Sequence, residues 1–500
     1  MVNCANKSGV GQNQVRVEWR MEFHQARRFL ALAKSLNRDS STAGVRSQFP
    51  AVIATSAAFF MIVLDTSIVN LALPRIKDVF QGDLTSLQWL VDGYALVFAN
   101  LLLNAGALGD RYGAKRVFTS GLLLFCLASA ACGLAPSLAS LQIARAVQGV
   151  GAALLLPNSL AALNHTVEDP DRRKTAVAAW STAGALGVAL GPLVGGILVQ
   201  YLDWRSIFLV NVPVGLVALW LARRHVASGS RHGHREFDLI GQGLAIATLA
   251  VLTYWMISVG RSHEFSFVTI GLGGLVLVLG GAFLRVEAQQ ISPMVPLDLL
   301  FRPSLGNVAI VGLLHNVGIY GLIFVLSLAF QELRGMTPVG AGLLFLPMTL
   351  TLAIGTRAGA KLLNKSNPFG PQIWGHAASA LGAASLAVLG FDHGMVAVAI
   401  PLCIIGLGGG VTVPSMNLSA LDAVERERSG LASGILNSAR QTGGVIGVAL
   451  LGALVGGPAT AIGATWAATA AAISLAGASL LAAKIGRQHR AWVAARVEVE

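Results

Sequence analysis

Two charged residues lie inside stretches that are otherwise apolar enough to sit in a lipid bilayer. Arg145 belongs to LQIARAVQGVGAALLLP, residues 141–157, and Asp65 to LDTSIVNLALP, residues 64–74. A charged side chain inside a membrane helix is costly, so it normally faces a bundle interior or a water-filled cavity and has a partner. A carboxyl group and a guanidinium in one cavity could bind a ligand or take up a proton.

The two residues are expected at the same depth. Asp65 precedes Pro74 by nine residues and Arg145 follows Pro136 by nine, with both prolines expected at outer helix ends. At about 1.5 Å per residue, each lies roughly 13 Å below the outer edge. We predict that they share one polar cavity, and that protonation of Asp65 changes its interaction with Arg145 or with substrate. The alternative is a static salt bridge, because buried ion pairs also occur without a function.

Other polar side chains could line the same cavity. Asp92 either faces it or caps the start of its helix, and the uncharged amides either line it or join helices by hydrogen bonds. A buried histidine can titrate near neutral pH, although a lone one also serves as a structural hydrogen-bonding group. The two acids and two arginines among the candidates balance in charge, so the sequence does not force a cationic substrate. The candidate cavity residues are Asp65, Arg145, Asn70, Asp92, Gln148, His315, Asn316 and Arg440.

The composition requires a membrane protein. Of the 500 residues, 54% are hydrophobic and 12% are charged, against about 25% charged in soluble domains. The net charge of +12 does not indicate nucleic-acid binding, because most Lys and Arg fall in short loops and tails. The cysteines form no CxxC pair and lie near no histidine cluster, so we predict neither a metal site nor a disulfide framework. We also expect no cofactor.

The hydropathy pattern predicts an all-α fold with fourteen transmembrane helices, since about 20 apolar residues span a bilayer. If both termini are cytoplasmic, the inside loops hold most of the Lys and Arg, as the positive-inside rule requires. This orientation places the chain in the cytoplasmic (inner) membrane as a multi-pass protein. The expected spans are 50–73, 87–109, 116–135, 138–163, 174–199, 205–222, 239–260, 266–284, 306–331, 339–362, 371–390, 394–420, 430–455 and 458–484.

An internal repeat indicates two halves. Gly149-Val-Gly151 followed by Pro157 recurs as Gly406-Leu-Gly408 followed by Pro414, and parallel halves around a central site are an arrangement of membrane transporters. Residues 17–36 of the N-terminal tail could form a basic helix on the membrane surface or stay disordered. The expected organisation is a cytoplasmic basic tail, a six-helix bundle, a linker with two extra helices, a second six-helix bundle and a cytoplasmic tail, at 1–49, 50–222, 223–305, 306–484 and 485–500.

Two glycine-rich segments could control movement. The short inside loop after the second span could latch the cytoplasmic side by pairing Asp110 with basic residues or a helix end; its residues are Gly109, Asp110, Arg111, Gly113, Lys115 and Arg116. The fifth span could act as a pivot, because glycines allow close packing and a proline kinks a helix; its residues are Gly187, Gly191, Pro192, Gly195 and Gly196.

These segments resemble motifs of the major facilitator superfamily. LDTSIVNLALPRI, GALGDRYGAKRV, IARAVQGVGAALLLPNS and GVALGPLVGG are similar to its first-helix, loop, fourth-helix and antiporter fifth-helix motifs, and SGLASGILNSARQTGGVIGVALLG is similar to a late helix of its fourteen-helix drug:proton antiporters. Asp92 resembles a branch that includes methylenomycin-resistance-type exporters. The resemblance implies the major facilitator fold and proton-driven drug efflux. It implies that Asp65 is a proton or substrate site, Arg145 the coupling residue, Asp110 the gate and Gly191-Pro192 the antiport hinge.

We therefore expect a proton-coupled exporter of small amphipathic drugs or antibiotics, driven by the proton motive force and working by alternating access. Its partners would be a small-molecule substrate, protons and the lipid bilayer, without nucleic acid, and we expect a monomer. The alternative within transport is an importer or facilitator of a small metabolite, and a more distant one is a receptor-like protein. A membrane-embedded enzyme would need a nucleophile with its base, or a metal cluster, at one depth, and the sequence shows neither.

Overall fold

The computed structural model describes residues 48–228, 238–262, 266–290, 293, 297–363, 369–389, 394–425, 428–455 and 460–497, and these residues form helices and connecting loops. The expectation of a surface helix at 17–36 lies outside them. The long helices are α2 (Phe49–Phe80), α3 (Leu84–Tyr112), α4 (Ala114–Gly133), α5 (Leu138–Thr166), α6 (Pro170–Tyr201), α8 (Asn211–His225), α9 (Leu239–Ser262), α10 (Phe267–Gln289), α12 (Pro303–Leu328), α13 (Pro338–Leu362), α14 (Gly370–Leu389), α15 (Met395–Asp422), α16 (Ser429–Val455) and α17 (Ala461–Val497). Short elements are α7 (Ser206–Leu209), α11 (Leu297–Leu300) and the π-helix η1 (Ala329–Leu333).

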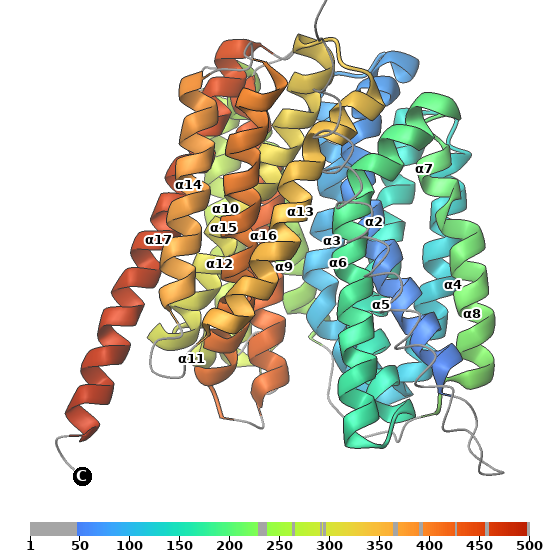
Figure 1. Ribbon diagram of the computed structural model, residues 1–500, viewed down its shortest axis with the longest axis vertical. Coiled ribbons are helices and arrows are strands. Elements are labelled where there is room, and N and C mark those ends of the chain that lie inside the picture. The colour runs from blue at the N-terminus through green and yellow to red at the C-terminus, as the bar shows by residue number, and fades with distance from the viewer. Residues whose placement is uncertain are drawn as a thin grey trace, which may run out of the picture.

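The helices form two groups that stand side by side (Figure 1). The first group is α2 to α8 and the second is α12 to α17. Within the first group α2 packs on α6, α3 on α5, and α4 on α5; within the second, α12 packs on α16, α13 on α15, and α14 on α15. The two groups therefore repeat one packing scheme, with α9 in contact with both α3 and α16.

The repeated glycines occupy matching places in the two groups. A Cβ on Gly149 of α5 would lie 2.6 Å from the Tyr94 carbonyl oxygen of α3, and one on Gly151 would lie 2.8 Å from the Phe125 nitrogen of α4. In α15, Gly406 is pressed against α13 and Gly408 against α14 in the same way. The sequence repeat thus marks the helix of each group that must approach two neighbours at backbone contact.

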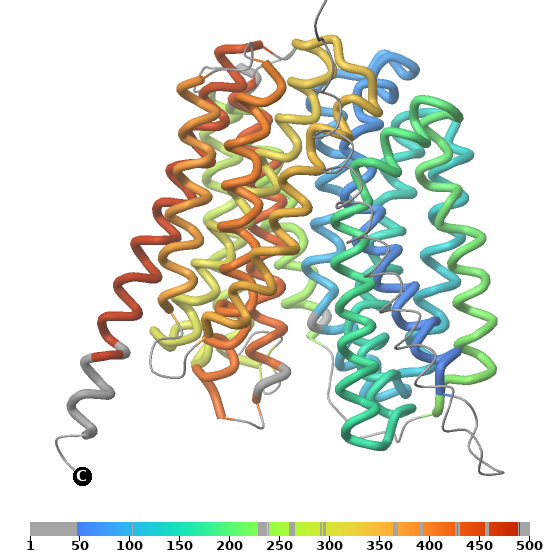
Figure 2. The backbone as a smooth tube through the Cα atoms, viewed as in Figure 1, coloured from blue at the N-terminus to red at the C-terminus, as the bar shows by residue number. Residues whose placement is uncertain are grey.

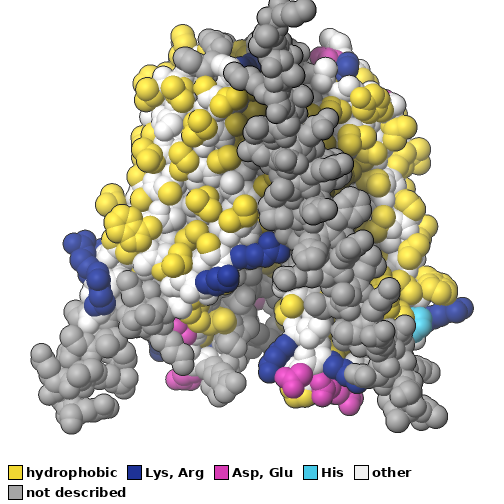
Figure 3. All heavy atoms as spheres, viewed as in Figure 1, with side chains coloured by type: hydrophobic (Ala, Val, Ile, Leu, Met, Phe, Trp, Pro, Cys, Tyr) yellow, Lys and Arg dark blue, Asp and Glu magenta, His cyan; other side chains and the backbone are white. Residues whose placement is uncertain are grey.

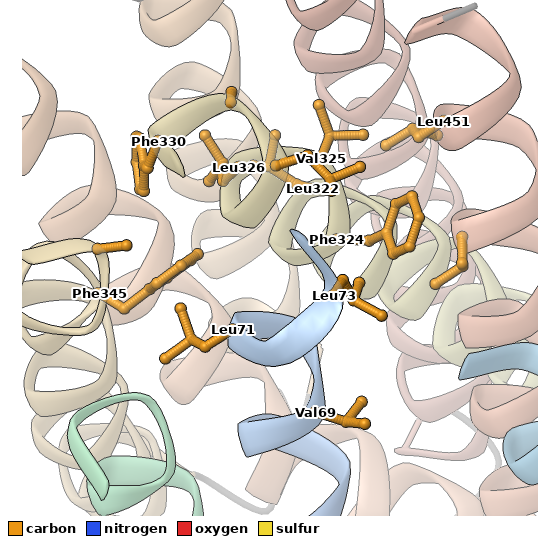
Figure 4. Packing of buried hydrophobic residues seen from close by; sticks show 14 of the residues in the cluster. Val69, Leu71, Leu73, Leu322, Phe324, Val325, Leu326, Phe330, Phe345 and Leu451 are labelled. Atoms are coloured by element: carbon orange, nitrogen blue, oxygen red, sulfur yellow. The ribbon is translucent and has the colours of Figure 1, made fainter. Parts of the chain in front are cut away.

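The groups share a hydrophobic core at the end where α2 finishes and α3 begins, which is the upper end in Figure 1. There Val69, Leu71 and Leu73 of α2 lie near residues of α12, α13 and α16 (Figure 4). Other core clusters belong to one group alone: one joins α2, α3, α4, α5 and α8, and another joins α12, α15, α16 and α17. Apolar burial therefore holds the groups together at the upper end.

The upper end also carries polar contacts between the groups. Ser327 of α12 donates to the Asn70 carbonyl at 2.7 Å, and Gln88 of α3 donates to the carbonyls of Val448 and Ala449 of α16 at 3.1 and 3.0 Å. Further down, Ser438 of α16 donates to the Ala99 carbonyl at 3.4 Å. These bonds satisfy main-chain and side-chain groups that the bilayer would leave without water.

The surface fits a bilayer. Hydrophobic side chains cover most of the described face in Figure 3, and charged side chains gather mainly at its lower end. The chain enters α2 at that lower end, and α17 runs down toward the same end (Figure 2). The described part of the chain is thus an all-α polytopic membrane protein.

The expected count of fourteen spans differs from the structure. Twelve helices among the described residues are long and apolar enough to cross a membrane, or thirteen if α3, which bends by 52°, is one span. The helix that falls short is α14. It has 20 residues and buries Gln372, His376 and Ser379 in its first half, and these polar groups lower its hydropathy.

Two helices extend beyond the expected spans. Pro74 does not end the first helix: α2 continues to Phe80, and Ile76 beyond the proline is fully buried. Packing of that last turn against the core offsets the backbone hydrogen bond that proline removes. The last helix does not stop at residue 484 either, since α17 continues to Val497.

Candidate functional site

A buried ion pair lies at the centre of the first group. Nη1 of Arg145 on α5 lies 2.5 Å from Oδ2 of Asp65 on α2, and both side chains are 1% exposed. Oδ1 of Asp65 accepts hydrogen bonds from Gln148 at 2.9 Å and from Asn211 of α8 at 3.0 Å. The carboxylate therefore has donors on both oxygens, which is what an ionised buried carboxylate needs.

The amides of this network are fixed by further contacts. Gln148 accepts from Nη1 of Arg145 at 2.7 Å and donates to Ser129 of α4 at 2.7 Å. Asn211 also approaches the Ser129 hydroxyl, at 3.4 Å. Four helices thus contribute to one network, so a change at Asp65 is transmitted to α4, α5 and α8 together.

Arg145 also lies close to two aromatic rings. Its guanidinium carbon lies 4.1 Å from the centre of the Tyr94 ring and 5.7 Å from that of Phe208, and Nε donates to the Leu90 carbonyl at 3.5 Å. A guanidinium on an aromatic face is attracted by the ring quadrupole. The contact of Gly149 with α3 brings the two helices close enough for this stacking.

The structure brings together only some of the predicted cavity residues. Asp65, Arg145 and Gln148 meet, whereas Asn70 donates to the Thr66 carbonyl within its own helix at 3.3 Å. Sequence reasoning missed Asn211, Ser129 and Tyr94. An amide in an apolar span marks Asn211 as a candidate, but nothing in the spacing distinguishes Ser129 or Tyr94 from other residues of their helices.

Asp92 lies apart from the ion pair and does not cap its helix. α3 begins at Leu84, and the capping side chain is that of Asp83, which accepts from the Ser86 nitrogen. Gln88, Asp92 and Ala99 follow one stripe of α3, and the first and last of these contact α16. Asp92 is fully buried, and neither of its carboxyl oxygens has a hydrogen-bond partner among the described residues.

His315, Asn316 and Arg440 belong to the second group. His315 and Asn316 of α12 are 4% and 3% exposed, and the His315 ring lies edge to face with that of His376 of α14, with 5.1 Å between ring centres. Arg440 of α16 packs its methylenes near Gly312 of α12. These residues form a polar cluster separate from the Asp65 network.

The loop between α3 and α4 lies at the lower end. Gly113 has a φ of 93°, a left-handed conformation that glycine adopts without a steric cost. A Cβ on Gly109 would collide with Asn158 of α5. Asp110 is exposed, and no ion pair is recorded between it and another described residue. Arg111, Lys115 and Arg116 flank the turn.

The glycines of α6 contact two different helices. A Cβ on Gly187 would lie 2.9 Å from the Phe60 carbonyl oxygen, and one on Gly195 would lie 3.0 Å from Cβ of Ile68, both on α2; Gly191 faces Ser67 there. Gly196 instead faces α13, where a Cβ would lie 2.6 Å from the Pro338 carbonyl oxygen. Pro192 lies inside a continuous α6 and its carbonyl faces Gly342 of α13.

A profile of the major facilitator superfamily matches residues 55–448, which is most of the chain. The chain belongs to the major facilitator superfamily. It is 36% identical over 409 residues to the drug efflux pump JefA of Mycobacterium tuberculosis, covering 81% of this chain and 80% of that protein. It is 34% identical over 421 residues to the methylenomycin A resistance protein of Streptomyces coelicolor, covering 83% and 87%.

The superfamily fold is also found in solved structures. A POT family transporter crystallised with a thioalcohol-conjugated peptide superimposes with a TM-score of 0.65 at 14% identity, over 88% of this chain and 96% of that one. This likeness concerns the fold alone. The chain is therefore a major facilitator transporter homologous to drug and antibiotic efflux pumps, and its family is not one of enzymes.

Proposed function

We propose that this protein is a proton-coupled antiporter that exports small amphipathic drugs or antibiotics across the cytoplasmic membrane. The observation that carries the proposal is the buried Asp65–Arg145 pair, with Gln148 and Asn211 on the same carboxylate. Protonation of Asp65 would remove its charge and leave Arg145 without its counter-ion. The network then has to rearrange, and four helices of the first group contribute to it.

We propose the following assignment of the other predicted residues. Asp92, at the contact of α3 with α16, is a second proton-binding carboxyl that responds to separation of the two groups. Asn70 contributes to the contact of α2 with α12 through its carbonyl, which accepts from Ser327. The turn around Asp110 is the gate at the lower end, and the α6 face from Gly187 to Gly196 is the hinge against α2 and α13.

The distribution of basic residues supports the orientation that we propose. The lower end holds the α3–α4 turn with Arg111, Lys115 and Arg116, and basic loops favour the cytoplasmic side. The shared core then closes the periplasmic or outer side, and both ends of the chain are cytoplasmic. In this assignment the arrangement is the inward-facing one, which loads substrate from the cytoplasm.

We propose fourteen spans in two bundles, 50–222 and 306–484, joined by a linker at 223–305 that carries α9 and α10, with a cytoplasmic tail at each end. The support is that α14 packs between α15 and α17 as α4 packs between α5 and α8. Single cysteines at Leu363 and Gly394 test this. If α14 crosses, a membrane-impermeant maleimide reaches them from opposite sides in oriented cells; labelling from one side rejects the fourteen-span topology.

The function is tested with purified protein in liposomes under an imposed pH gradient, using a panel of dyes and antibiotics. We expect gradient-driven movement of several amphipathic compounds by the wild type and none by Asp65→Asn. A flat pH response in both proteins removes the proton role. Accumulation of a small metabolite, with no movement of any drug, favours the importer. Light scattering of the purified protein checks the proposed monomer.

A further inference from the structure

Arg440 is a cation inside the second group without an anion beside it. The structure records no hydrogen bond or ion pair for its guanidinium among the described residues, and its Nε is buried without a partner. The other arginine deep in the helices, Arg145, has the Asp65 carboxylate at 2.5 Å. A buried unpaired charge is costly unless a counter-ion binds to it.

The second embedded acid does not serve as that counter-ion. Asp92 follows the stripe of α3 that contains Gln88, opposite Val448 and Ala449 of α16, whereas Arg440 turns toward Gly312 of α12. The charges that balance in the sequence are therefore separate in space.

The two histidines near Arg440 have free hydrogen-bonding capacity. His315 lies within the electrostatic reach of both Arg440 and His376, and its Nδ1 is buried without a partner. Nδ1 of His376 is 2.7 Å from the Gln372 carbonyl and must donate to it, so this ring's tautomer is fixed and Nε2 is left without a partner. The edge-to-face contact with His376 orients the His315 ring.

This cluster also faces the first group. Tyr320 of α12 packs its ring beside Gly444 of α16, one helical turn after Arg440. It also lies close enough to Tyr94 of α3 to act on it electrostatically, and Tyr94 is the ring on which Arg145 stacks. Arg440 and Tyr320 are both partly exposed, unlike Arg145.

We propose that Arg440, His315 and Tyr320 form a binding subsite for an acidic group of the transported molecule, such as a carboxylate or an ionised enol. The proposal rests on the function proposed above and names the class of its substrates as amphipathic acids or zwitterions. A guanidinium offers a planar pair of N–H donors that matches a carboxylate. Tyr320 and His315 would add single hydrogen bonds, and His376 would position His315.

The test compares three probes of one scaffold: 1-naphthylacetate, 1-naphthylacetamide and 1-naphthylethylammonium. Their dissociation constants are measured by calorimetry on the purified full chain in a non-ionic detergent. A hydrogen-bonded charge pair contributes about 1.5–3 kcal/mol, so we expect the acid to bind the wild type at least about tenfold more tightly than the amide or the amine. Arg440→Gln should reduce that preference to less than about twofold.

Two variants make the test specific. Arg440→Lys keeps the charge but loses the planar fork, and should retain part of the preference; it also covers the case in which Arg440→Gln does not fold. Arg428 lies just before α16, is 51% exposed and has its Nη1 3.3 Å from Oδ2 of Asp298. Arg428→Gln therefore serves as the control and should leave the affinities for all three probes unchanged.

The proposal is overturned if the amide or amine binds as tightly as the acid, if no probe binds at millimolar concentration, or if both Arg440 variants keep the full preference. These measurements need no proton gradient. Failure of drug export in liposomes would therefore reject the proposed function without changing the result of these binding measurements. Export of cationic dyes together with no binding of acids would reject the subsite and leave proton-coupled export standing.

Discussion

Nζ of Lys77 lies 2.7 Å from Oε1 of Glu332, and this ion pair joins the last turn of α2 to the π-helical segment that follows α12. The two side chains are 27% and 20% exposed. The pair thus connects the two helix groups at the upper end, beside the shared hydrophobic core. It was not among the residues that the sequence singled out.

Neutralising this pair should favour opening at the upper end. An ion pair with partial exposure contributes about 0–1 kcal/mol, so Glu332→Gln should change the ratio of open to closed molecules by no more than about fivefold. Double electron–electron resonance between spin labels at Gln81 and Ala461 measures that ratio. The charge-swapped pair Lys77→Glu with Glu332→Lys should restore that ratio. A swap that opens the upper end further would show that the ion pair does not hold the two groups together.

Removing Arg145 should destabilise the protein more than removing both charges. Arg145→Leu leaves the Asp65 carboxylate buried without its cation, which costs about 3–5 kcal/mol. Asp65→Asn combined with Arg145→Leu should recover most of that loss, while transport stays absent. Thermal unfolding followed by size-exclusion chromatography gives the comparison; equal stability of wild type and Arg145→Leu would mean that the pair is not buried as described.

Asp92→Asn should keep the fold but impair transport. Because neither carboxyl oxygen of Asp92 has a partner among the described residues, the neutral amide removes no recorded hydrogen bond. We expect a melting temperature at or above that of wild type, together with at least about tenfold slower gradient-driven export if Asp92 is a proton-binding group. Wild-type export by this variant would rule out the proposed proton role of Asp92.

Gly196→Ala should hinder closure of the upper end. The added Cβ would lie 2.6 Å from the Pro338 carbonyl oxygen and 2.9 Å from Cα of Val339, and backbone atoms cannot move aside as a flexible side chain does. The spin-label pair at Gln81 and Ala461 should show a larger open population. Gly274→Ala in α10, where a Cβ meets nothing within 4 Å, is the control.

Gly109→Ala should weaken the contact of α3 with α5. Its Cβ would collide with the amide of Asn158, which donates to the Ala105 carbonyl at 2.8 Å. Loss of that buried hydrogen bond should destabilise by about 1–3 kcal/mol. Gly106→Ala, three residues earlier, has only an ordinary contact at 4.0 Å and corrects for the higher helix propensity of alanine. Equal melting temperatures for the two variants would disprove the contact.

Much of the fold follows from the sequence because the bilayer imposes one-dimensional rules. Long apolar stretches form helices, since a chain in lipid must satisfy its own backbone groups. The spacing of Asp65 and Arg145 from their prolines predicted equal depth, and the structure pairs them, although Pro74 lies inside α2 rather than at its end. The repeated glycines marked the helices that approach their neighbours at backbone contact.

The site's composition depended on the tertiary structure. Asn211 and Ser129 join Asp65 because α8 and α4 pack around α2 and α5, and hydropathy does not encode that neighbourhood. The sequence alone determined which stretches form long apolar helices and how the polar residues are spaced along each of them, because both depend on distance along one helix. Only the tertiary structure decided that Arg145 has a counter-ion and Arg440 has none among the described residues, because the rotation of each helix about its axis is set by side-chain packing against its neighbours.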